Sequence, residues 1–321
     1  MDNPLEKWDA AVAAYLTSRH ALGRAYKKEE WVLGGVRAFL VKAGAADLDQ
    51  ALFDQWREPF YQRTSSTRVV HERTVYNFCH YRRRSEPACF LPDSASLARQ
   101  HPHPLPTIIE REQIVQLLDY VSELSSKPRQ ALRAAALRLA IVLLYTTGLR
   151  RGELIRLTLG DVDVHQGVLF IRGSKFHKSR WVPLSASVRT ELCNYLAARR
   201  QAGVDGSESA PLVCSQHGRA LTGSGLYQSL KHVLAAAGIH DSSGHRPCVQ
   251  DFRHSFAVAA LLRWYENDAD VQVNLPKLAL YMGHVSIVST AYYLRLMPAV
   301  IEQASRRFER SYAQVLDGGA S

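Results

Sequence analysis

Apolar residues recur at helical spacing in four stretches within residues 5–84. In each stretch they lie three or four positions apart, which places them on one face of a helix. The positions are Trp8, Val12, Tyr15 and Leu16; Trp31, Val32, Val36, Phe39 and Leu40; Leu48, Leu52, Phe53 and Trp56; and Val69, Val70, Val75, Tyr76 and Phe78. The pattern predicts a small domain of four helices joined by short loops.

The helical pattern stops between Pro87 and Pro106. This stretch contains five prolines and has no amphipathic period. Because proline fixes φ and removes a backbone donor, we expect an irregular segment here rather than a further helix. The sequence thus predicts a helical domain over residues 1–100, a linker over 101–107 and a second domain over 108–321.

The second domain changes its period twice. Residues 130–147 are nearly all apolar and predict a buried helix that ends at Gly148. Between Asp161 and Leu184, three short runs predict strands, with Lys175 in the turn between the second and the third. Helical spacing returns over 187–200, 222–237, 251–266, 275–282, 286–296 and 299–316. The chain is therefore predicted to be mainly α-helical with a small β-sheet.

The charge balance of the chain favours a polyanionic partner. Lys and Arg number 40 against 30 Asp and Glu, a formal net charge of +10. One run of six arginines accompanies a single acid, Glu72: Arg63, Arg68, Arg73, Arg82, Arg83 and Arg84. Such a run can be a solvated helix face. We favour a surface that contacts DNA phosphates, because acidic residues are common elsewhere in this domain.

Other classes of protein are disfavoured by what the sequence contains. The five cysteines are scattered and form no CxxC pair, which argues against a disulfide framework or a zinc site. His101 and His103 have no third ligand nearby and are interpreted as solvated loop residues. No apolar run reaches 18 residues and no signal peptide is recognisable, so we expect no membrane contact and a cytoplasmic protein associated with the nucleoid.

Five residues stand in an order that suits phosphodiester chemistry. Arg150 lies in TTGLRRGEL, Lys175 in IRGSKFHKSRWVPL, Arg253 in DFRHSFAV and His284 in YMGHVS, and Tyr293 follows His284 by nine residues. Two guanidinium groups and an imidazole can neutralise the charge that develops on phosphoryl oxygens. A tyrosine hydroxyl can act as the nucleophile.

With these motifs in this order, the chain resembles the tyrosine recombinases, also called phage-type integrases. The resemblance is specific over residues 108–300 and looser over 1–100. It implies a two-domain clamp on double-stranded DNA, formed by a helical core-binding domain and a mixed α+β catalytic domain. It also implies site-specific cutting and rejoining through a 3′-phosphotyrosyl intermediate, without metal or cofactor. The long interval between Arg253 and His284 resembles the transposon-borne branch.

The resemblance assigns roles to the residues of the first half of the motif. Arg150 corresponds to the first catalytic arginine, and Glu153 is expected to orient it; alone, the two could be an ordinary ion pair. Lys175 corresponds to the general acid that protonates the departing 5′-oxygen. Lys178 matches a second basic position that contacts the DNA backbone.

Around Arg253, the second catalytic arginine, the chain departs from the family. The position three residues earlier most often holds His or Lys, and here it holds Gln250. Glutamine can donate a hydrogen bond but cannot carry a proton at neutral pH. We interpret His254, which follows the arginine, as a residue that packs its helix.

The resemblance also assigns the end of the chain. His284 is expected to donate to the phosphate, and its spacing selects Tyr293 rather than Tyr292 as nucleophile. The tail over 299–321 either packs on its own domain or docks into a neighbouring protomer, as in the homotetramers of the family. Related recombinases or accessory proteins are further expected partners. Two alternatives stay open: an inactive DNA-binding protein of the same fold, suggested by Gln250, and a topoisomerase IB-like enzyme that nicks and reseals one duplex.

Overall fold

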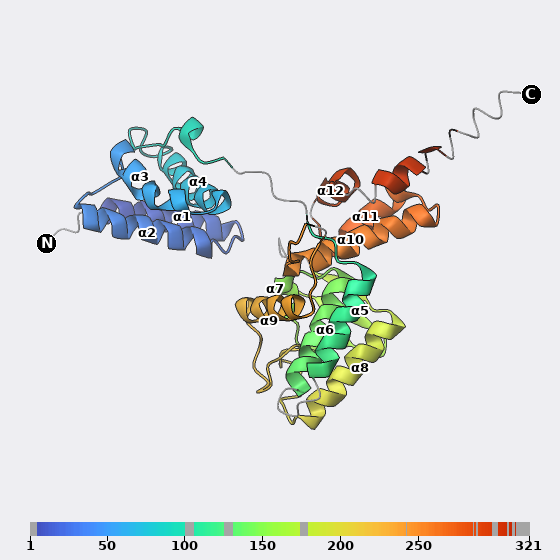
Figure 1. The fold of residues 1–321 in the computed structure, drawn as a ribbon. Coiled ribbons are helices and arrows are strands. Elements are labelled where there is room, and N and C mark those ends of the chain that lie inside the picture. Colours follow the sequence, from blue (N-terminus) through green and yellow to red (C-terminus); the bar gives the residue numbers. More distant parts are fainter. Residues whose placement is uncertain are drawn as a thin grey trace, which may run out of the picture. The chain divides into compact units, whose positions relative to one another are not determined.

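The computed structural model describes residues 5–99, 106–124, 131–173, 179–241, 243–284, 286, 288–296, 301–306, 308–309 and 312. The chain divides into two compact units, Met1–Pro104 and Leu105–Ser321, and each is described by itself (Figure 1). Most of the predicted linker over 101–107 lies outside the described residues.

The first unit is a helical bundle. Its elements are α1 (Glu6–Ala21), α2 (Lys27–Ala43), α3 (Gln50–Arg57), the short 3-10 helix η1 (Glu58–Gln62) and α4 (Ser65–Arg82). The core forms around Trp8 and Phe78, whose ring centroids are 5.0 Å apart. The four helical stretches that the sequence indicated are thus present. One expected core position was wrong: Trp31 is 68% exposed, because its neighbour Val32 takes the inward position.

The segment after α4 packs on this bundle as far as residue 99. It includes a 3-10 helix, η2 (Ser94–Ser96), and buries Leu97 against the core. The backbone N–H of Ala98 donates to the buried carboxylate of Glu72, 2.6 Å away. The first part of the proline-rich stretch is therefore ordered and belongs to the first unit.

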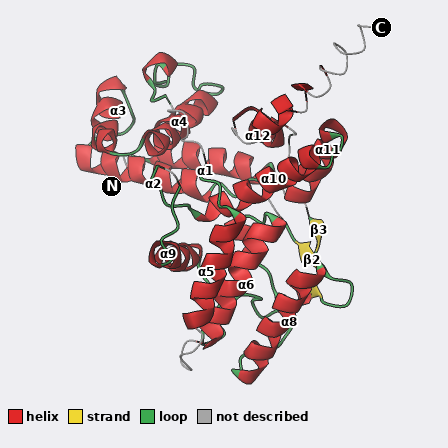
Figure 2. Cartoon of the chain, turned by 45° about the vertical axis from the view of Figure 1, so that its right-hand side comes forward, coloured by secondary structure: helices red, strands yellow, loops and turns green. Residues whose placement is uncertain are grey.

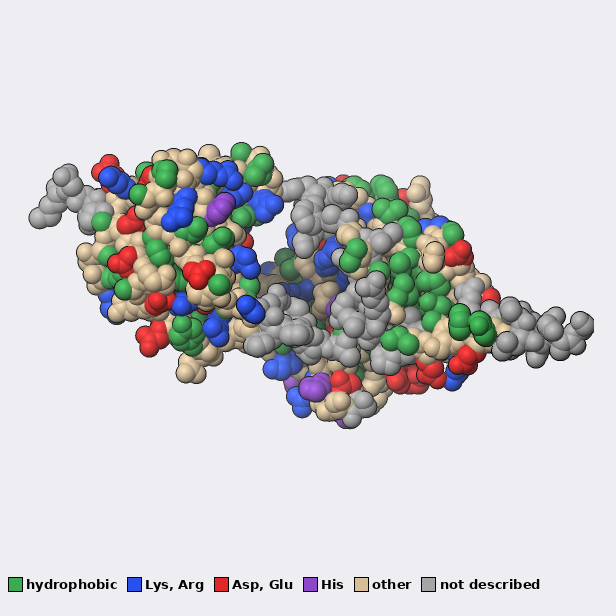
Figure 3. Space-filling view, turned by 90° about the horizontal axis from the view of Figure 1, so that it is seen from above, with side chains coloured by type: hydrophobic (Ala, Val, Ile, Leu, Met, Phe, Trp, Pro, Cys, Tyr) green, Lys and Arg blue, Asp and Glu red, His purple; other side chains and the backbone are tan. Residues whose placement is uncertain are grey.

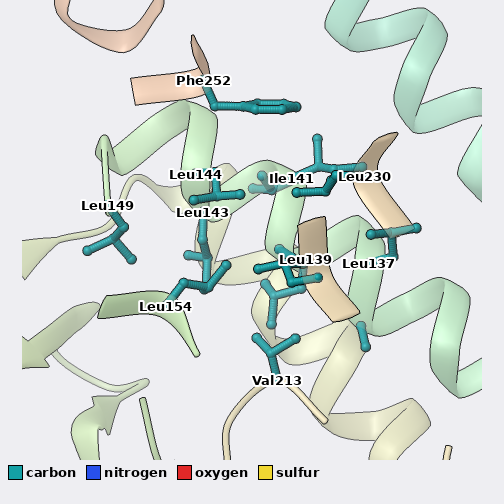
Figure 4. Close-up of a cluster of buried hydrophobic side chains, with 14 of the residues drawn as sticks. Leu137, Leu139, Ile141, Leu143, Leu144, Leu149, Leu154, Val213, Leu230 and Phe252 are labelled. Atoms are coloured by element: carbon teal, nitrogen blue, oxygen red, sulfur yellow. The ribbon is translucent and has the colours of Figure 1, made fainter. Parts of the chain in front are cut away.

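The second unit is built around one almost wholly buried helix, α6 (Ala131–Thr147). It packs against α5 (Arg111–Leu124), α8 (Ala186–Gln201) and α10 (Val249–Glu266). Figure 4 shows leucines of α6 converging with Phe252 of α10 and with Leu230 of α9 (Gly223–Ala236). The prediction of a buried helix over 130–147 is confirmed, and its apolar surface on all sides is explained by these neighbours.

A small antiparallel sheet lies beside α11 (Val271–Met282), as Figure 2 shows for two of its strands. Its strands, in the order β1-β2-β3, are β1 (Val162–Asp163), β2 (Val168–Ile171) and β3 (Arg180–Pro183). Leu169 pairs with Val182, and both are completely buried. The predicted mainly helical fold with a small sheet is confirmed. Lys175 and Lys178 lie in 174–178, outside the described residues.

Helices α10 and α11 and the last described long helix, α12 (Val288–Leu296), form a second core of this unit around Leu261 and Met282. Helix α11 begins four residues earlier than the sequence indicated, because Asp270 caps it by accepting from the N–H groups of Gln272 and Val273. Pro276 lies inside the helix rather than at its start. No helix among the described residues is long and apolar enough to cross a membrane.

Candidate active site

A glycine turn after α6 positions Arg150. Gly148 has φ of +60°, and a Cβ atom there would lie 2.5 Å from Cδ1 of Phe256, so the turn requires glycine. Arg150 then precedes the short helix α7 (Arg151–Leu154), and its backbone N–H donates to Oε2 of Glu153, 3.0 Å away. The guanidinium is thus supported at the end of a buried helix.

The Glu153 carboxylate joins two arginines. Its side chain is 1% exposed and accepts from Nη1 of Arg150 at 2.8 Å. It also accepts from Nη1 and Nη2 of Arg180, at 3.1 and 2.9 Å. Burying a carboxylate costs free energy unless it is paired, and here both oxygens are used. The sequence analysis predicted no role for Arg180. Its position at the start of the predicted strand RWVPL was the only sequence feature that could have indicated one.

Three arginines donate to consecutive carbonyl groups at the C-terminal end of α11. Arg180 Nε donates to the carbonyl of Tyr281 at 2.7 Å, Arg253 Nη2 to that of Met282 at 2.7 Å, and Arg150 Nη2 to that of Gly283 at 2.9 Å. A helix ends in carbonyl groups without intrahelical partners, and its dipole is negative there. The helix end therefore gathers three guanidinium groups.

Arg253 is the most enclosed of the three. It is 1% exposed and also donates to the carbonyl of Gly148. Burial lowers the pKa of Arg253 to about 9, and the nearby Arg150 charge acts in the same direction. The guanidinium is still charged at neutral pH. Its described hydrogen bonds go to carbonyl oxygens rather than to a carboxylate, so a bound anion would compensate its buried charge.

His284 follows the helix end directly. Its Nδ1 lies 2.6 Å from Oγ1 of Thr290, a completely buried residue of α12. Burial lowers the pKa of His284 to about 4, with Arg253, Arg150 and Arg180 adding to the effect. The imidazole is therefore neutral at pH 7. If Nδ1 accepts from the threonine hydroxyl, the ring hydrogen lies on Nε2 and can be donated from there.

Tyr293 lies on α12, is only 3% exposed and contacts His254. Its Oη is 2.6 Å from Nδ1 of His254, which directly follows Arg253 on α10. The interpretation of His254 as a packing residue of its helix was incomplete, because the contact spans 39 residues and has no local signal. The side chain of Tyr292 lies outside the described residues.

The remaining candidates are more dispersed. Gln250 is exposed in the first turn of α10. In the first unit Arg63, Arg73, Arg83 and Arg84 are exposed, and Arg68 is partly buried with its guanidinium 4.9 Å above the Tyr61 ring.

The prediction that Arg82 belongs to a DNA-contacting surface is wrong, because its side chain is buried in ion pairs. Its side chain is 5% exposed and donates to both oxygens of Asp47, each at 2.8 Å, and to Glu86. These bonds hold the end of α4 to the loop before α3. In Figure 3 many Lys and Arg side chains gather along the right-hand margin of the left-hand unit, and most of its acidic side chains lie further left.

The described ranges contain no group of three or more His, Cys, Asp or Glu residues placed to hold a metal ion. The candidate site consists of three guanidinium groups with the carboxylate of Glu153, two imidazoles and a phenol. These groups lie at the end of α11 and on the adjoining parts of α10 and α12. Such a set can bind a phosphate group and present a nucleophile to it.

Comparison with known proteins identifies the family of the chain. The model of the phage integrase family matches residues 107–299, more than half of the chain. The chain belongs to the phage integrase family. Its sequence is 32% identical to a putative integrase/recombinase, y4rE, of Sinorhizobium fredii, over 97% of this chain and 96% of that one. It is 30% identical to tyrosine recombinase XerD of Yersinia pestis, over 82% and 81% of the two chains.

Solved structures share the fold. The XerH recombinase in a post-cleavage complex with difH has a TM-score of 0.62 and 20% identity, covering 87% of this chain and 78% of that one. The Tn1549 transposon integrase, in complex with transposon right-end DNA, has a TM-score of 0.64 and 15% identity, covering 94% and 99%. The predicted family and enzyme class are confirmed: this is a tyrosine recombinase, a site-specific DNA recombinase.

Proposed function

We propose that this recombinase cuts and rejoins double-stranded DNA by forming a covalent bond between Tyr293 and a 3′-phosphate. The observation that supports the proposal most is the gathering of Arg150, Arg180 and Arg253 at the end of α11, with His284 directly after it. Three positive charges accompany one carboxylate, Glu153. The excess of two positive charges matches the two negative charges of the phosphorane formed when a tyrosinate attacks a phosphodiester.

The chemistry divides among these groups. Arg150 and Arg253 stabilise the nonbridging oxygens, and neutral His284 donates to them from Nε2. Glu153 holds the guanidinium of Arg150, and Arg180 holds Glu153 while it also bonds the end of α11. Gln250, exposed near this site, offers a neutral hydrogen bond to the phosphate and no proton transfer.

Lys175 serves as the general acid for the departing 5′-oxygen. It lies in residues 174–178, between β2 and β3, and the described residues on either side are held by contacts. The N–H of Gly173 donates to Oγ of Ser179 at 3.2 Å, and Arg180, which opens β3, is held by Glu153. Lys178, in the same stretch of sequence, contacts the DNA backbone.

The first unit supplies a second DNA contact. Its exposed arginines Arg63, Arg73, Arg83 and Arg84, with Arg68, are suited to phosphate contacts that release counterions. Residues 1–100 and 108–321 would then bind one duplex together, with 101–107 as linker. This assigns the protein to the DNA-containing compartment, the cytoplasm and its nucleoid.

A homotetramer on DNA follows from the same proposal. Ile301, Phe308 and Tyr312 of the tail are exposed, and the last two stack with ring centroids 5.4 Å apart. Large apolar side chains left in water favour burial against a neighbouring protomer. Related recombinases or accessory proteins could occupy the same surface.

The test is a DNA duplex taken from the flanks of the gene and nicked close to the scissile phosphate, so that cleavage releases a short strand and traps the adduct. The wild-type chain should form a protein–DNA adduct that survives denaturation, Tyr293→Phe should form none, and Tyr292→Phe should retain it. Binding without any wild-type adduct would instead indicate an inactive DNA-binding protein. Relaxation of one supercoiled circle without exchange between two duplexes would indicate a topoisomerase-like enzyme.

A further inference from the structure

The contact between His254 and Tyr293 concerns the one hydroxyl that the proposed reaction must activate. Nδ1 of His254 and Oη of Tyr293 are 2.6 Å apart, a short hydrogen bond between two side chains from different helices. The ring centroids lie 5.5 Å apart and the ring planes are tilted by 58°, so the rings do not stack. Tyr293 is 3% exposed, so bulk water has little access to it and is a poor candidate for accepting its proton.

The other residues assigned to the proposed phosphate site are poor acceptors for the proton of Tyr293. Arg150, Arg180 and Arg253 are donors only, and Gln250 cannot carry a proton. His284 uses Nδ1 for Thr290, and its place between three guanidinium groups disfavours the imidazolium form. An acceptor for the phenolic proton is nevertheless needed, because a phenol is a weak nucleophile at its free pKa of about 10.

We propose that His254 is a catalytic residue of this recombinase, the base that takes the proton from Tyr293 through Nδ1. This rests on the proposed function. In the cleavage step Oη forms a bond to phosphorus while its proton passes to Nδ1, and the bond from phosphorus to the 5′-oxygen breaks. The 5′-oxygen takes a proton from the general acid. In the rejoining step a 5′-hydroxyl attacks phosphorus and gives its proton to the conjugate base of the same general acid. The bond from phosphorus to Oη breaks, and Nδ1 returns its proton to Oη.

The surroundings of His254 favour its role as an acceptor. Burial lowers its pKa, Asp251 opposes this shift, and the adjacent Arg253 adds to it. The ring is therefore neutral at neutral pH, which leaves Nδ1 free to accept. Because Arg253 and His254 are consecutive on α10, the same helix turn supplies a group for the phosphate and a base for the nucleophile.

The experiment measures the single-turnover rate of adduct formation by the full chain on the nicked duplex. His254→Asn keeps a hydrogen-bonding group near the position of Nδ1 but cannot take up a proton, and His254→Gln is the second variant in case the first does not fold. Either should slow the adduct by about 10²–10⁴-fold, the usual contribution of general acid–base catalysis, with DNA affinity unchanged. The matched control is His165→Asn, in the exposed turn between β1 and β2, which should react at the wild-type rate.

A second measurement separates proton transfer from packing. Replacing Tyr293 by 3,5-difluorotyrosine makes the phenol more acidic, so that a base contributes less. The rate defect of His254→Asn should then be smaller by roughly tenfold, as Brønsted behaviour implies. A defect of the same size with either phenol would overturn the proposal, because His254 would then act through packing alone. Wild-type rates in both His254 variants would overturn it as well and leave the proposed function standing. Failure of the wild-type chain to form any adduct would count against the proposed function itself.

Discussion

Nη2 of Arg150 donates a hydrogen bond to the carbonyl oxygen of Gly283, 2.9 Å away, and so joins the start of α7 to the end of α11. The contact crosses 133 residues of sequence. Its neighbour Arg180 reaches the carbonyl of Tyr281 and passes close to the same glycine. Gly283 thus leaves room for Arg180 at the helix end, and its carbonyl accepts from Arg150.

Gly283→Ala should disrupt this approach. A Cβ atom would lie 2.8 Å from Nη1 of Arg180, and φ of +67° alone disfavours alanine by about 1–2 kcal/mol. We expect adduct formation to fall at least about tenfold, on the scale of losing one aligned donor, while DNA binding persists. Gly238→Ala is the control, since Gly238 has the same φ and open space around it. Equal adduct rates in the two variants would show that the approach of Arg180 is unimportant.

Glu153→Gln should separate the two arginines that share the carboxylate. Both Arg150 and Arg180 would lose a buried countercharge, which typically destabilises a protein by about 3–5 kcal/mol when one partner of a buried pair is removed. We expect a lower midpoint of urea unfolding and a slower adduct. Glu191→Gln, which disturbs a more exposed pair with Arg138, should change the free energy of unfolding by no more than about 1 kcal/mol. Similar shifts in both would contradict a special role for Glu153.

His284 should make the free protein sensitive to acid. Its pKa is lowered from 6.5 to about 4 in the fold, so the unfolded chain binds a proton first as the pH falls. The stability due to the neutral ring is complete above pH 6.5 and is lost as the pH falls toward 4. His284→Asn should therefore lose less stability than the wild type between pH 7 and 4.5, measured by urea unfolding at about ten pH values. Parallel curves for the two proteins would refute this.

Two arginines of α4 should behave differently on substitution. Arg82→Ala should lower the stability of the first unit, because Asp47 and Glu86 lose their shared partner. Arg73→Ala should leave stability unchanged and reduce the slope of log affinity against log salt by about one. Thermal unfolding and DNA titrations at several salt concentrations distinguish them. The prediction fails if Arg82→Ala alters the salt slope in the same way at unchanged stability.

The elements of the fold were largely predictable because their signals are local. The apolar run of α6 and the break at Gly148 gave that helix, and alternating short runs gave the three strands. Capping by Asp270 set the start of α11, a local signal that the predicted range 275–282 did not include. Exposure of Trp31 could not be read from spacing, because several apolar residues competed for one face.

Only the site residues that lie in recognisable sequence motifs could be predicted. The partnership of Glu153 with Arg180 and that of His254 with Tyr293 join segments 27 and 39 residues apart, and no periodicity reports such contacts. Burial of Arg82 likewise depends on Asp47, 35 residues earlier. A basic residue in a run looks the same in sequence whether it faces water or a buried carboxylate. Side-chain packing makes that distinction.

The three carbonyl groups at the end of α11 have a consequence for how the site comes into being. The arginines that they hold come from the start of α7, the start of β3 and the first turns of α10, while the chain after the helix carries His284 and Tyr293. Under the proposed function, loss of this one helix end would release the groups that bind the phosphate and displace the nucleophile in the same event. A chain in which this helix end has not yet formed, or has opened locally, would then lack both parts of the proposed reaction and would not cleave DNA.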